Sequence, residues 1–326
     1  TVTDANVVLG RLPPSLLGGE MSLDVTAAEV AVNKVAARLG LSTQQAAQGI
    51  LDIVNENMLG ALRLVTVQKG LDPRDFALVA FGGAGPLHGN AIAMLAGCYP
   101  VIIPPTPGVL SALGFLYSDA KNEFAQTFIR NLDNVEAAEI AAVLTRLGAD
   151  ATQWLSEEGI AGGDQLVRYE ADVRYFRQGY EVALDVHPDR FSSATLDDLV
   201  DRFGAVHERL YGFKLDAAVE LVNLRAVGSG QVRKMELPRM SGGSSDASGA
   251  AMGREQVFFD GSFESASIYD RLKLQAGHLI HGPAIITQTD STALIHPGHT
   301  GHVDAYGNIL IMPAGEAPDA RRATSH

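Results

Sequence analysis

The sequence predicts a mixed α/β protein, and three observations carry this prediction. Residues 76–104 show the order strand, glycine-rich turn, helix and strand, which is typical of a βαβ unit with parallel strands. Two strongly alternating runs at 166–176 and 180–186 flank a short "RQG" turn, as expected for an antiparallel hairpin. After residue 253 the chain shows only strand patterns, broken by Gly, Pro, Asp and Asn.

The N-terminal segment is expected to contain a strand, a loop and an amphipathic helix. Residues 1–20 indicate a strand and then a loop, because two prolines and two glycines within 13–19 oppose regular structure. A capping box follows, in which Thr26 caps the first helical turn and Glu29 stands three residues later. Gly40 is the natural end of this helix, since glycine readily adopts the left-handed conformation of a C-terminal cap.

A second, longer helix is predicted directly afterwards. Ser42 is its N-cap, Gln45 is the capping-box partner and Gly70 ends it. Apolar residues recur at helical spacing along this segment, at Ile50, Ile53, Val54, Met58, Leu62 and Val65. This pattern indicates one long helix with a buried face.

The predicted βαβ unit begins with "FALVAF" at 76–81, a short continuous apolar run typical of a strand that is covered on both faces. The helix follows at 85–97, and the second strand, "VIIP", lies at 101–104. Between the first strand and the helix stands "FGGAG". The chain therefore leaves a buried strand and enters a turn that carries almost no side chains.

These patterns divide the chain into five segments. We expect an α/β lobe at 1–120, an α+β segment at 121–240, a flexible linker at 241–255, a small β domain at 256–313 and a tail at 314–326. The linker prediction comes from the Gly- and Ser-rich composition of "SGGSSDASGAAMG". The small β domain is expected because its short apolar runs are split by turn residues, as in a sandwich or a barrel.

Composition and charge exclude several classes of protein. The 326 residues are 46% hydrophobic and 19% charged, as in a folded globular protein, and no apolar run is long enough for a membrane span. The formal net charge of −13 argues against a nucleic-acid-binding surface, which depends on Lys and Arg facing phosphates. The single cysteine, Cys98, excludes an internal disulfide and, without a visible signal peptide, favours a cytoplasmic location.

The glycine-rich turn is the first candidate binding site. Gly82, Gly83 and Gly85 bare the backbone, together with the small side chain of Ala84, and the following helix points its free N–H groups back at the turn. Such a surface suits a nucleotide, although the spacing matches neither the dinucleotide fingerprint nor the phosphate loop with its Lys and Ser/Thr. The alternative is a tight βα turn that binds no ligand.

Four polar side chains are further candidates, and each has a structural alternative. Asp4 and Asn6 in "TDAN" could contact nucleotide, metal or substrate, or could bond to nearby backbone N–H groups. Arg11 suits a phosphate or a carboxylate, and equally a surface salt bridge. His88 stands one helical turn after the glycines, where it could reach the nucleotide, act as a base or cap a carbonyl group.

Histidines are frequent near the end of the chain, but we expect no metal there. No cysteine and no helical H-x-x-x-H pair accompanies them, and they alternate with Gly and Pro in predicted β-turns. The residues concerned are His278, His281, His296, His299 and His302.

Six stretches along nearly the whole chain stand in the same order as in a known family. They are "TVTDANVVLGRL", "FALVAFGGAGPLHG", "VIIPPTPGVLSALGFLYSD", "YEADVRYFRQGYEV", "LYGF…VELVNLRAVGSG" and "YDRLKLQAGHLIHGPAIITQTDSTALIHPG". Together they resemble the hydantoinase A / 5-oxoprolinase family, which includes ATP-dependent acetone and acetophenone carboxylase subunits. The resemblance implies an actin/Hsp70-like fold of the sugar kinase superfamily, in which two lobes clasp ATP and a glycine turn holds the adenosine. Because "FGGAGP" is similar to that turn, the resemblance implies cofactor-binding roles for Gly82, Gly83, Ala84, Gly85, His88, Asp4 and Asn6.

The sequence departs from this family at the phosphate end of the ATP site. The family's "DxGGT"-type phosphate loops lie upstream of "TVTDAN", and none occurs in this chain. The chain is therefore similar to the C-terminal half of a hydantoinase A subunit. The resemblance places the ligands of Mg²⁺ and of the β- and γ-phosphates on an N-terminal half. It also implies a hydantoinase B-like subunit as a further partner, in a hetero-oligomer that acts on a small-molecule substrate.

The resemblance implies part of an ATP-dependent hydrolase of cyclic amides, of the hydantoin, 5-oxoproline or lactam type. ATP would activate the substrate by phosphorylating its amide oxygen, and a partner subunit would complete the hydrolysis. Two alternatives stay open: a subunit of a ketone (acetone or acetophenone) carboxylase, and a non-catalytic assembly module of such a complex. No catalytic residue, no nucleic-acid partner and no membrane association is assigned from the sequence.

Overall fold

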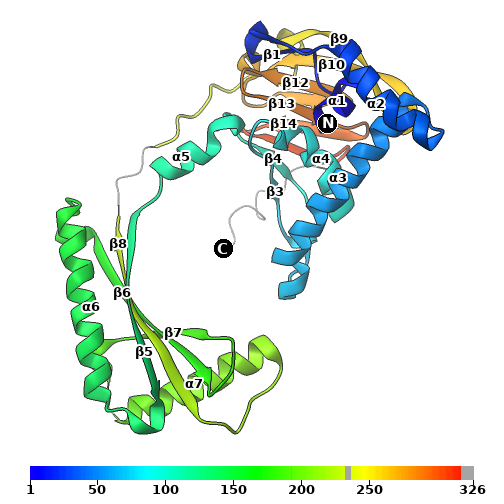
Figure 1. Ribbon diagram of the computed structural model, residues 1–326. Helices are drawn as coiled ribbons and strands as arrows, with labels where there is room; N and C mark the ends of the chain where they lie inside the picture. Colours follow the sequence, from blue (N-terminus) through cyan, green and yellow to red (C-terminus); the bar gives the residue numbers. More distant parts are fainter. Residues whose placement is uncertain (192, 232–235, 317–326) are drawn as a thin grey trace. The chain divides into compact units, whose positions relative to one another are not determined.

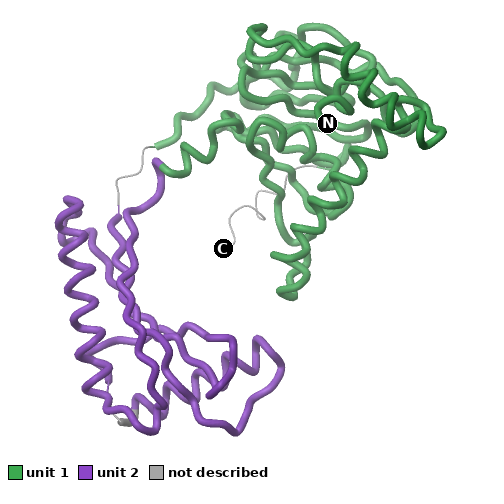
Figure 2. The backbone as a smooth tube through the Cα atoms, in the orientation of Figure 1, with its two compact units in different colours: residues 1–115, 236–326 green, residues 116–235 purple. Residues whose placement is uncertain are grey.

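Two units divide the chain, and Figure 2 shows them in different colours. Unit 1 combines Thr1–Phe115 with Glu236–His326, and unit 2 is Leu116–Met235. The end of the expected tail, 317–326, lies outside the described residues. None of the described helices is long and apolar enough to span a lipid bilayer. The computed structural model describes residues 1–191, 193–231 and 236–316.

Unit 1 contains the elements that position the candidate site, and Figure 1 shows them coloured along the sequence. The helices up to the unit boundary are α1 (Val2–Val8), α2 (Val25–Leu39), α3 (Thr43–Val65), α4 (Gly85–Ala96) and α5 (Leu110–Leu116). The strands are β1 (Ser15–Leu16), β2 (Met21–Ser22), β3 (Leu78–Val79), β4 (Val101–Ile103), β9 (Ala251–Phe259), β10 (Ser262–Asp270), β11 (Leu279–His281), β12 (Ala284–Gln288), β13 (Ser291–Ile295), β14 (His299–Val303) and β15 (Ile309–Pro313).

Two sheets form the body of unit 1. One has the strand order β11-β14-β15-β4-β3 and the other has the order β13-β12-β10-β9, while β1 and β2 pair with each other. Helices α1, α2 and α3 share a hydrophobic cluster with Phe258 of β9. Helix α4 contacts β3 and β4 of the first sheet and β13 of the second. The start of α4 is therefore close to strands that lie far away in the sequence.

The predicted βαβ unit is confirmed. Strands β3 and β4 are parallel, with Leu78 opposite Val101, and α4 connects them. Gly89 of α4 allows helix and sheet to approach closely, because a Cβ atom at this position would lie 2.7 Å from the Cβ of Ala80. The small residues of "GPLHGNAIAMLAG" thus serve helix–sheet packing as well as the turn.

The C-terminal strands do not form the separate β domain that the sequence indicated for 256–313. Strand β15 pairs antiparallel with β4, with Ile309 opposite Ile103 and Ile311 opposite Val101. All four side chains are buried and belong to one hydrophobic cluster. A local apolar pattern predicts that a strand forms but does not identify the strand it pairs with. The pairing of β4 with β15 could therefore not be predicted from the sequence.

The Gly- and Ser-rich stretch at 241–255 is not the free linker that its composition suggested. Gly243 N–H donates a hydrogen bond to the Ala276 carbonyl at 2.7 Å. Ala247 and Ala250 are buried in the same cluster as the central strands, and strand β9 already begins at residue 251. Small side chains allow flexibility in a free chain, but they also allow a segment to lie close against a sheet.

The N-terminal segment corrects two sequence-based predictions. Residues 2–8 form helix α1 and not a strand, because Thr1 and Asp4 make a capping box at its start. The N-cap of α2 is Asp24 and not Thr26. The Asp24 carboxylate accepts a hydrogen bond from the backbone N–H three residues later at 2.9 Å. Asp, Ser and Thr cap helices by the same chemistry, so spacing alone did not choose among neighbouring candidates.

The prediction for the long helix is confirmed at its start. Ser42 Oγ accepts a hydrogen bond from the Gln45 N–H at 3.1 Å, and Gln45 Oε1 accepts one from the Ser42 N–H at 3.0 Å. Helix α3 ends at Val65, and a short 3₁₀ turn leads to Gly70 in the left-handed conformation. The helix is thus one turn shorter than the pattern suggested.

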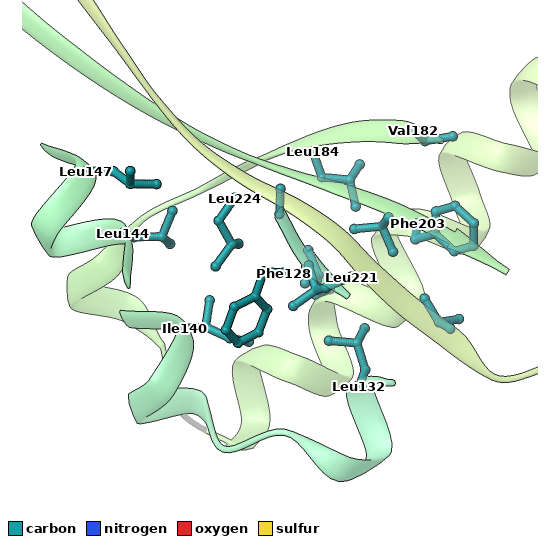
Figure 3. Close-up of a cluster of buried hydrophobic side chains, with 14 of the residues drawn as sticks. Phe128, Leu132, Ile140, Leu144, Leu147, Val182, Leu184, Phe203, Leu221 and Leu224 are labelled. Carbon is teal, nitrogen blue, oxygen red and sulfur yellow. The ribbon is translucent and has the colours of Figure 1, made fainter. Parts of the chain in front are cut away.

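Unit 2 is a four-stranded antiparallel sheet in the order β5-β8-β6-β7, with two helices. The predicted hairpin is confirmed, since Tyr169 lies opposite Val186 and Val173 opposite Val182. Figure 3 shows side chains from the strands and from both helices filling one core, among them Phe203. The elements are β5 (Ala120–Asn131), α6 (Ala137–Glu157), β6 (Gln165–Tyr175), β7 (Val182–Val186), α7 (Ser193–Tyr211) and β8 (Val219–Gly230).

Candidate functional site

The glycine turn after β3 is held by the loop that follows β4. Gly82 adopts φ +81°, a conformation that favours glycine, and its N–H donates to the Pro107 carbonyl at 2.7 Å. Gly83 does not adopt the left-handed conformation. A Cβ atom there would meet the Asp290 carbonyl oxygen at 3.5 Å, an ordinary contact distance. The two glycines therefore differ: Gly82 is required by backbone geometry, whereas Gly83 is not.

The N-terminus of α4 faces the turn without a side-chain cap. Ala84 is the N-cap residue, Gly85 opens the helix, and no side chain accepts a hydrogen bond from the first turn. Pro86 in the first turn has no N–H to satisfy. The partial positive charge of the helix dipole at this end favours an electron-rich group nearby.

A pocket of about 430 Å³ opens beside this turn. It is lined by α1, by the segment from Leu12 to Met21, by the start of α4 and by the turn from β12 into β13. Four of the predicted site residues line it together: Asn6, Gly83, Ala84 and His88. Gly82, Gly85 and Asp4 do not line the pocket.

Asp4 and Asn6 have separate roles although they are two residues apart. The Asp4 carboxylate accepts hydrogen bonds from the Thr1 amino group at 2.6 Å and from Thr1 Oγ1 at 2.7 Å, as the partner of the N-cap residue Thr1 in the capping box of α1. This is the local backbone role that the sequence left as an alternative. Asn6 is buried, its Nδ2 donates to the Val2 carbonyl at 3.1 Å, and its side chain forms part of the pocket wall.

His88 is oriented by a residue that the sequence did not single out. Its Nδ1 lies 2.9 Å from the Oδ1 of Asn55 on α3, and both side chains are buried. An amide oxygen accepts, so Nδ1 carries the proton and the lone pair stands on Nε2. Burial, and then the charge of Arg11, lower the pKa of His88, so the ring is neutral at pH 7.

A signal for Asn55 was present in the sequence. It lies between Leu51 and Leu59 at intervals of four residues, on the buried face of α3. A polar side chain on an otherwise apolar helix face requires a hydrogen-bond partner. This spacing predicts a buried polar contact, although it does not identify the partner.

The opposite wall of the pocket comes from the chain about 200 residues later. Ser291 Oγ donates to the carbonyl oxygens of Gly83 at 3.1 Å and Gly82 at 3.4 Å. Gln288 Nε2 donates to Asp290 Oδ1 at 2.6 Å and also to the carbonyl of Pro105 at 3.2 Å. The sequence placed these residues in a separate β domain, and so it could not associate them with the glycine turn.

Arg11 and the C-terminal histidines lie elsewhere. Arg11 is buried, not on the surface, and it donates to the Phe258 carbonyl and to Gln48 Oε1. Among the histidines, His299 Nε2 lies 2.9 Å from the Tyr99 hydroxyl, and His281 Nδ1 lies 3.3 Å from a threonine hydroxyl of β14. In the part of the chain that the structure describes, no three His, Cys, Asp or Glu residues are grouped to hold a metal ion.

Comparison with known protein families identifies the family of this chain. Residues 1–124 match the hydantoinase/oxoprolinase family, and residues 130–311 match the hydantoinase/oxoprolinase C-terminal domain. The chain belongs to the hydantoinase/oxoprolinase family. The resemblance inferred from the sequence is thereby confirmed, and the two matches together cover both units.

Several relatives of this hydantoinase/oxoprolinase chain are about twice as long. An uncharacterized protein of Methanocaldococcus jannaschii is 37% identical over 95% of this chain and 44% of its own length. Caprolactamase subunit alpha of Pseudomonas jessenii is 29% identical over 96% of this chain and 46% of that subunit. The acetophenone carboxylase gamma subunit of Aromatoleum aromaticum is 29% identical over 100% of this chain and 46% of that subunit.

A solved structure confirms the predicted mixed α/β fold class. The crystal structure of the ATP-dependent caprolactamase from Pseudomonas jessenii matches with a TM-score of 0.82 at 29% identity. The match covers 96% of this chain and 47% of that chain. This chain thus spans about half the length of the curated relatives it matches.

Proposed function

We propose that this chain supplies the adenosine-binding half of an ATP-dependent enzyme that opens cyclic amides. The observation that carries the proposal is the pocket beside the glycine turn, in which Gly83, Ala84, His88 and Asn6 meet. The ATP dependence named for the caprolactamase of similar fold supports it.

The pocket has the chemistry that a nucleoside needs. Its volume of about 430 Å³ lies in the range of small-molecule sites. Leu12 and Leu87 offer apolar contact for a flat base, and Gly83 allows close approach to the backbone. His88 Nε2 is the acceptor for a ribose hydroxyl, because Asn55 Oδ1 holds the proton on Nδ1.

The phosphates and Mg²⁺ require groups that this chain does not gather. Its sequence contains no "DxGGT"-type loop, and the described residues include no cluster of carboxylates fit for a metal ion. Mg²⁺ prefers oxygen ligands and is usually held by one or two carboxylates and the phosphates themselves. We therefore assign the phosphate loops and the Mg²⁺ ligands to an N-terminal half, either as a separate chain or as part of a longer one.

The proposed reaction is hydrolysis of a cyclic amide after activation by ATP. The amide oxygen forms a bond to the γ-phosphorus, and the bond between the γ-phosphorus and the β–γ bridging oxygen breaks, releasing ADP. A first water adds to the activated carbon and the ring C–N bond breaks, which gives an acyl phosphate with a free amino group. A second water then hydrolyses the acyl phosphate, releasing phosphate and an open-chain amino acid. We assign these two hydrolytic steps to a hydantoinase B-like partner subunit, so the active complex is a hetero-oligomer.

A ketone carboxylase subunit is the second candidate function. The acetophenone carboxylase gamma subunit has the same 29% identity to this chain as caprolactamase subunit alpha. Both chemistries begin with phosphorylation of an oxygen, so the pocket described above serves either one. A non-catalytic assembly role is the third candidate, and it differs because it requires no nucleotide.

Reconstitution tests the proposal. ATP hydrolysis is measured for residues 1–326 alone, with a polypeptide that carries the "DxGGT"-type loops, and with a hydantoinase B-like subunit in addition. We expect no turnover by the chain alone, because catalysis of phosphoryl transfer depends on groups around the γ-phosphate. With all parts present, ADP release should depend on a lactam such as caprolactam. Dependence on a ketone and bicarbonate instead would establish the carboxylase alternative, and assembly without nucleotide binding would refute the nucleotide site.

A further inference from the structure

A second pocket of about 320 Å³ lies in unit 1 and shares no lining residue with the pocket beside the glycine turn. Its walls come from α3, α4, the segment after β9 and the end of β13. The apolar part of the wall includes Phe259 and the side chains of Met94 and Leu95. The polar part consists of one buried arginine, one histidine, two amide side chains and several acidic side chains. Of these, only Asn55 also serves the proposed nucleotide site, where it orients His88.

Arg11 presents a positive charge to this pocket without a direct ion pair, although the nearby charges of Asp52 and Asp260 partly offset its burial. It is only 4% exposed, yet its guanidinium forms no ion pair with any carboxylate in the described ranges. Nε and Nη2 donate to the Phe258 carbonyl, and Nη2 also donates to Gln48 Oε1 at 2.6 Å. Nη1 donates to no described residue and keeps accessible surface. A buried cation of this kind favours an anionic partner from outside the chain.

His296 adds a second polar group to the same wall. Its Nε2 is buried and has no hydrogen-bond partner among the residues described. The ring lies against Phe259, with centroids 5.2 Å apart, and Phe259 in turn stacks under the Arg11 guanidinium at 5.0 Å. Burial lowers the pKa of His296 to about 3, with smaller contributions from Arg11 and His299, so the ring is neutral and has one nitrogen that can donate.

Acidic side chains line the exposed part of the pocket. Asp52, Glu56 and Asp260 are all exposed, and none of them forms an ion pair with another described residue. Asp52 accepts a hydrogen bond from Gln48 Nε2 at 2.6 Å, which connects it to the Arg11 side chain through Gln48. A simple anion would be repelled by these carboxylates on its way to Arg11, whereas a ligand with its own ammonium group would be attracted.

We infer that this pocket binds a small zwitterionic amino acid. Its carboxylate accepts a hydrogen bond from Arg11 Nη1 and lies beside the neutral His296 ring, and its ammonium group lies near Asp52, Glu56 and Asp260. The methylene groups between these ends lie against Phe259 and the apolar residues of α4. The contacts assigned to this ligand do not involve Asn55 or His88, so binding here can be tested apart from the proposed nucleotide site.

Calorimetric titration of the 326-residue chain with matched probes tests the inference. The zwitterionic probes are glycine, 4-aminobutanoate and 6-aminohexanoate, which differ in the spacing of their charges. The controls are butanoate and butylamine, each of which carries one of the two charges. We expect at least one zwitterion to bind with saturation, about tenfold or more tighter than either control.

Two substitutions separate the roles of the charges. Asp260→Asn removes one of the carboxylates at the exposed part of the pocket. The backbone at position 260 has φ +44°, a conformation that Asn tolerates, so the variant should keep the fold. We expect it to weaken binding of the zwitterion roughly threefold to tenfold while binding of butanoate is unchanged or stronger. Arg11→Met should abolish binding of both. Asp75→Asn, which removes an exposed carboxylate of unit 1 outside the pocket, is the matched control and should change nothing.

Three results would overturn the inference. The first is no saturable binding of any zwitterionic probe up to about 10 mM, a concentration that would detect even weak sites. The second is equal affinity for 4-aminobutanoate and butanoate, which would mean that the carboxylates at the exposed part of the pocket do not select an ammonium group. The third is an unchanged zwitterion affinity in Asp260→Asn and in Glu56→Gln, which remains a valid test if Arg11→Met does not fold.

Discussion

The arginines of the two units are used in different ways. In unit 2, Arg225 Nη2 lies 2.5 Å from Asp172 and 3.2 Å from Glu170, and Arg174 Nε lies 2.6 Å from Glu220. In unit 1 the buried arginines are Arg11 and Arg271, and both donate to backbone carbonyls. Neither forms an ion pair within the described ranges.

This difference separates a scaffold from a binding unit. Unit 2 pairs its partly buried arginines with carboxylates and buries a single apolar core, and its buried side-chain atoms without a partner are Arg225 Nε and Gln178 Oε1 among the described residues. Unit 1 places the Arg11 guanidinium and the unpartnered Nε2 of His296 at the wall of one pocket, and Asn6 and His88 at the wall of another. Polar groups arranged in this way are typical of binding sites, because burial without a partner costs free energy that a ligand can offset. The comparison predicts that substitutions in unit 2 change stability and that those in unit 1 change binding.

The largest effect is expected from Phe203→Ala in unit 2. Phe203 is fully buried in the core that Figure 3 shows, and its loss should lower the free energy of unfolding by about 3–5 kcal/mol. Denaturant unfolding measures this. Nucleotide affinity of the folded variant in the reconstituted complex should stay within about twofold of the wild type. A large loss of affinity would show that unit 2 is part of the binding site.

Gly83→Val should weaken nucleotide binding about tenfold or more, corresponding to about 1.4 kcal/mol. Gly83 lines the pocket, so Val adds bulk at its wall, and the backbone of Gly83 accepts a side chain without left-handed strain. Titration of the complex with ATP measures the affinity. Gly82→Val is the matched control, because Gly82 has φ +81° but does not line the pocket. This control should lose stability by about 1 kcal/mol or more. Unchanged affinity in well-folded Gly83→Val would refute the adenosine site.

Asn55→Asp should change the pH dependence of nucleotide binding. In the wild type the His88 pKa is lowered, so Nε2 accepts a hydrogen bond down to pH values below 6.5. A carboxylate at position 55 would raise the His88 pKa, and affinity should then fall already near neutral pH. The shift in the pH profile of Kd is the readout, and Asn55→Leu is expected to lower affinity without this shift. Identical profiles for wild type and Asn55→Asp would contradict the role of His88 as acceptor.

The same lowered pKa has a consequence for stability. The folded-state pKa of His88 lies below the unfolded value of 6.5, so the unfolded chain binds the proton more tightly. Its contribution to stability is therefore complete above that pH and is lost as the pH falls below it. The melting temperature should change less with pH, between neutral and mildly acid conditions, for His88→Gln than for the wild type.

Ser291→Ala is expected to have the smallest effect. It removes the hydrogen bonds to the carbonyl oxygens of Gly82 and Gly83, which connect β13 to the glycine turn. A single such contact contributes about 1 kcal/mol. Both the melting temperature and the nucleotide affinity should fall slightly, because this residue serves the fold and the pocket together. An effect on stability alone would mean that the turn keeps its shape without β13.

Local signals predicted much of the fold. The Ser42–Gln45 capping box, the hairpin of β6 and β7 and the βαβ unit were all readable, because each depends on residues that lie close together in the sequence. The N-terminal helix α1 was not recognised. The two prolines and two glycines within 13–19 favoured a strand and a loop for residues 1–20. The capping pair of α1, Thr1 and Asp4, was the missed signal.

Only one wall of the candidate pocket could be predicted from the sequence. The glycine turn and His88 follow from the pattern after β3, but the wall made by Ser291 and its neighbours depends on contacts across about 200 residues. The pairing of β15 with β4 has the same origin. Such non-local partners are decided by packing and hydrogen bonding in the folded chain, and no local pattern reports them. For Asn55, the helical spacing indicated a buried polar side chain, but it did not identify His88 as the hydrogen-bond partner.

Photoaffinity labelling locates the adenosine-binding residues directly. The reconstituted complex is irradiated with an azido-adenine derivative of ATP, digested and mapped by mass spectrometry, with excess ATP as competitor. We expect the label within this chain to fall on peptides that contain the glycine turn and the start of α4, or residues 288–292 opposite them. We also expect Gly83→Val to reduce this label. Labelling confined to unit 2, or labelling that excess ATP does not suppress, would contradict an adenosine site beside the glycine turn.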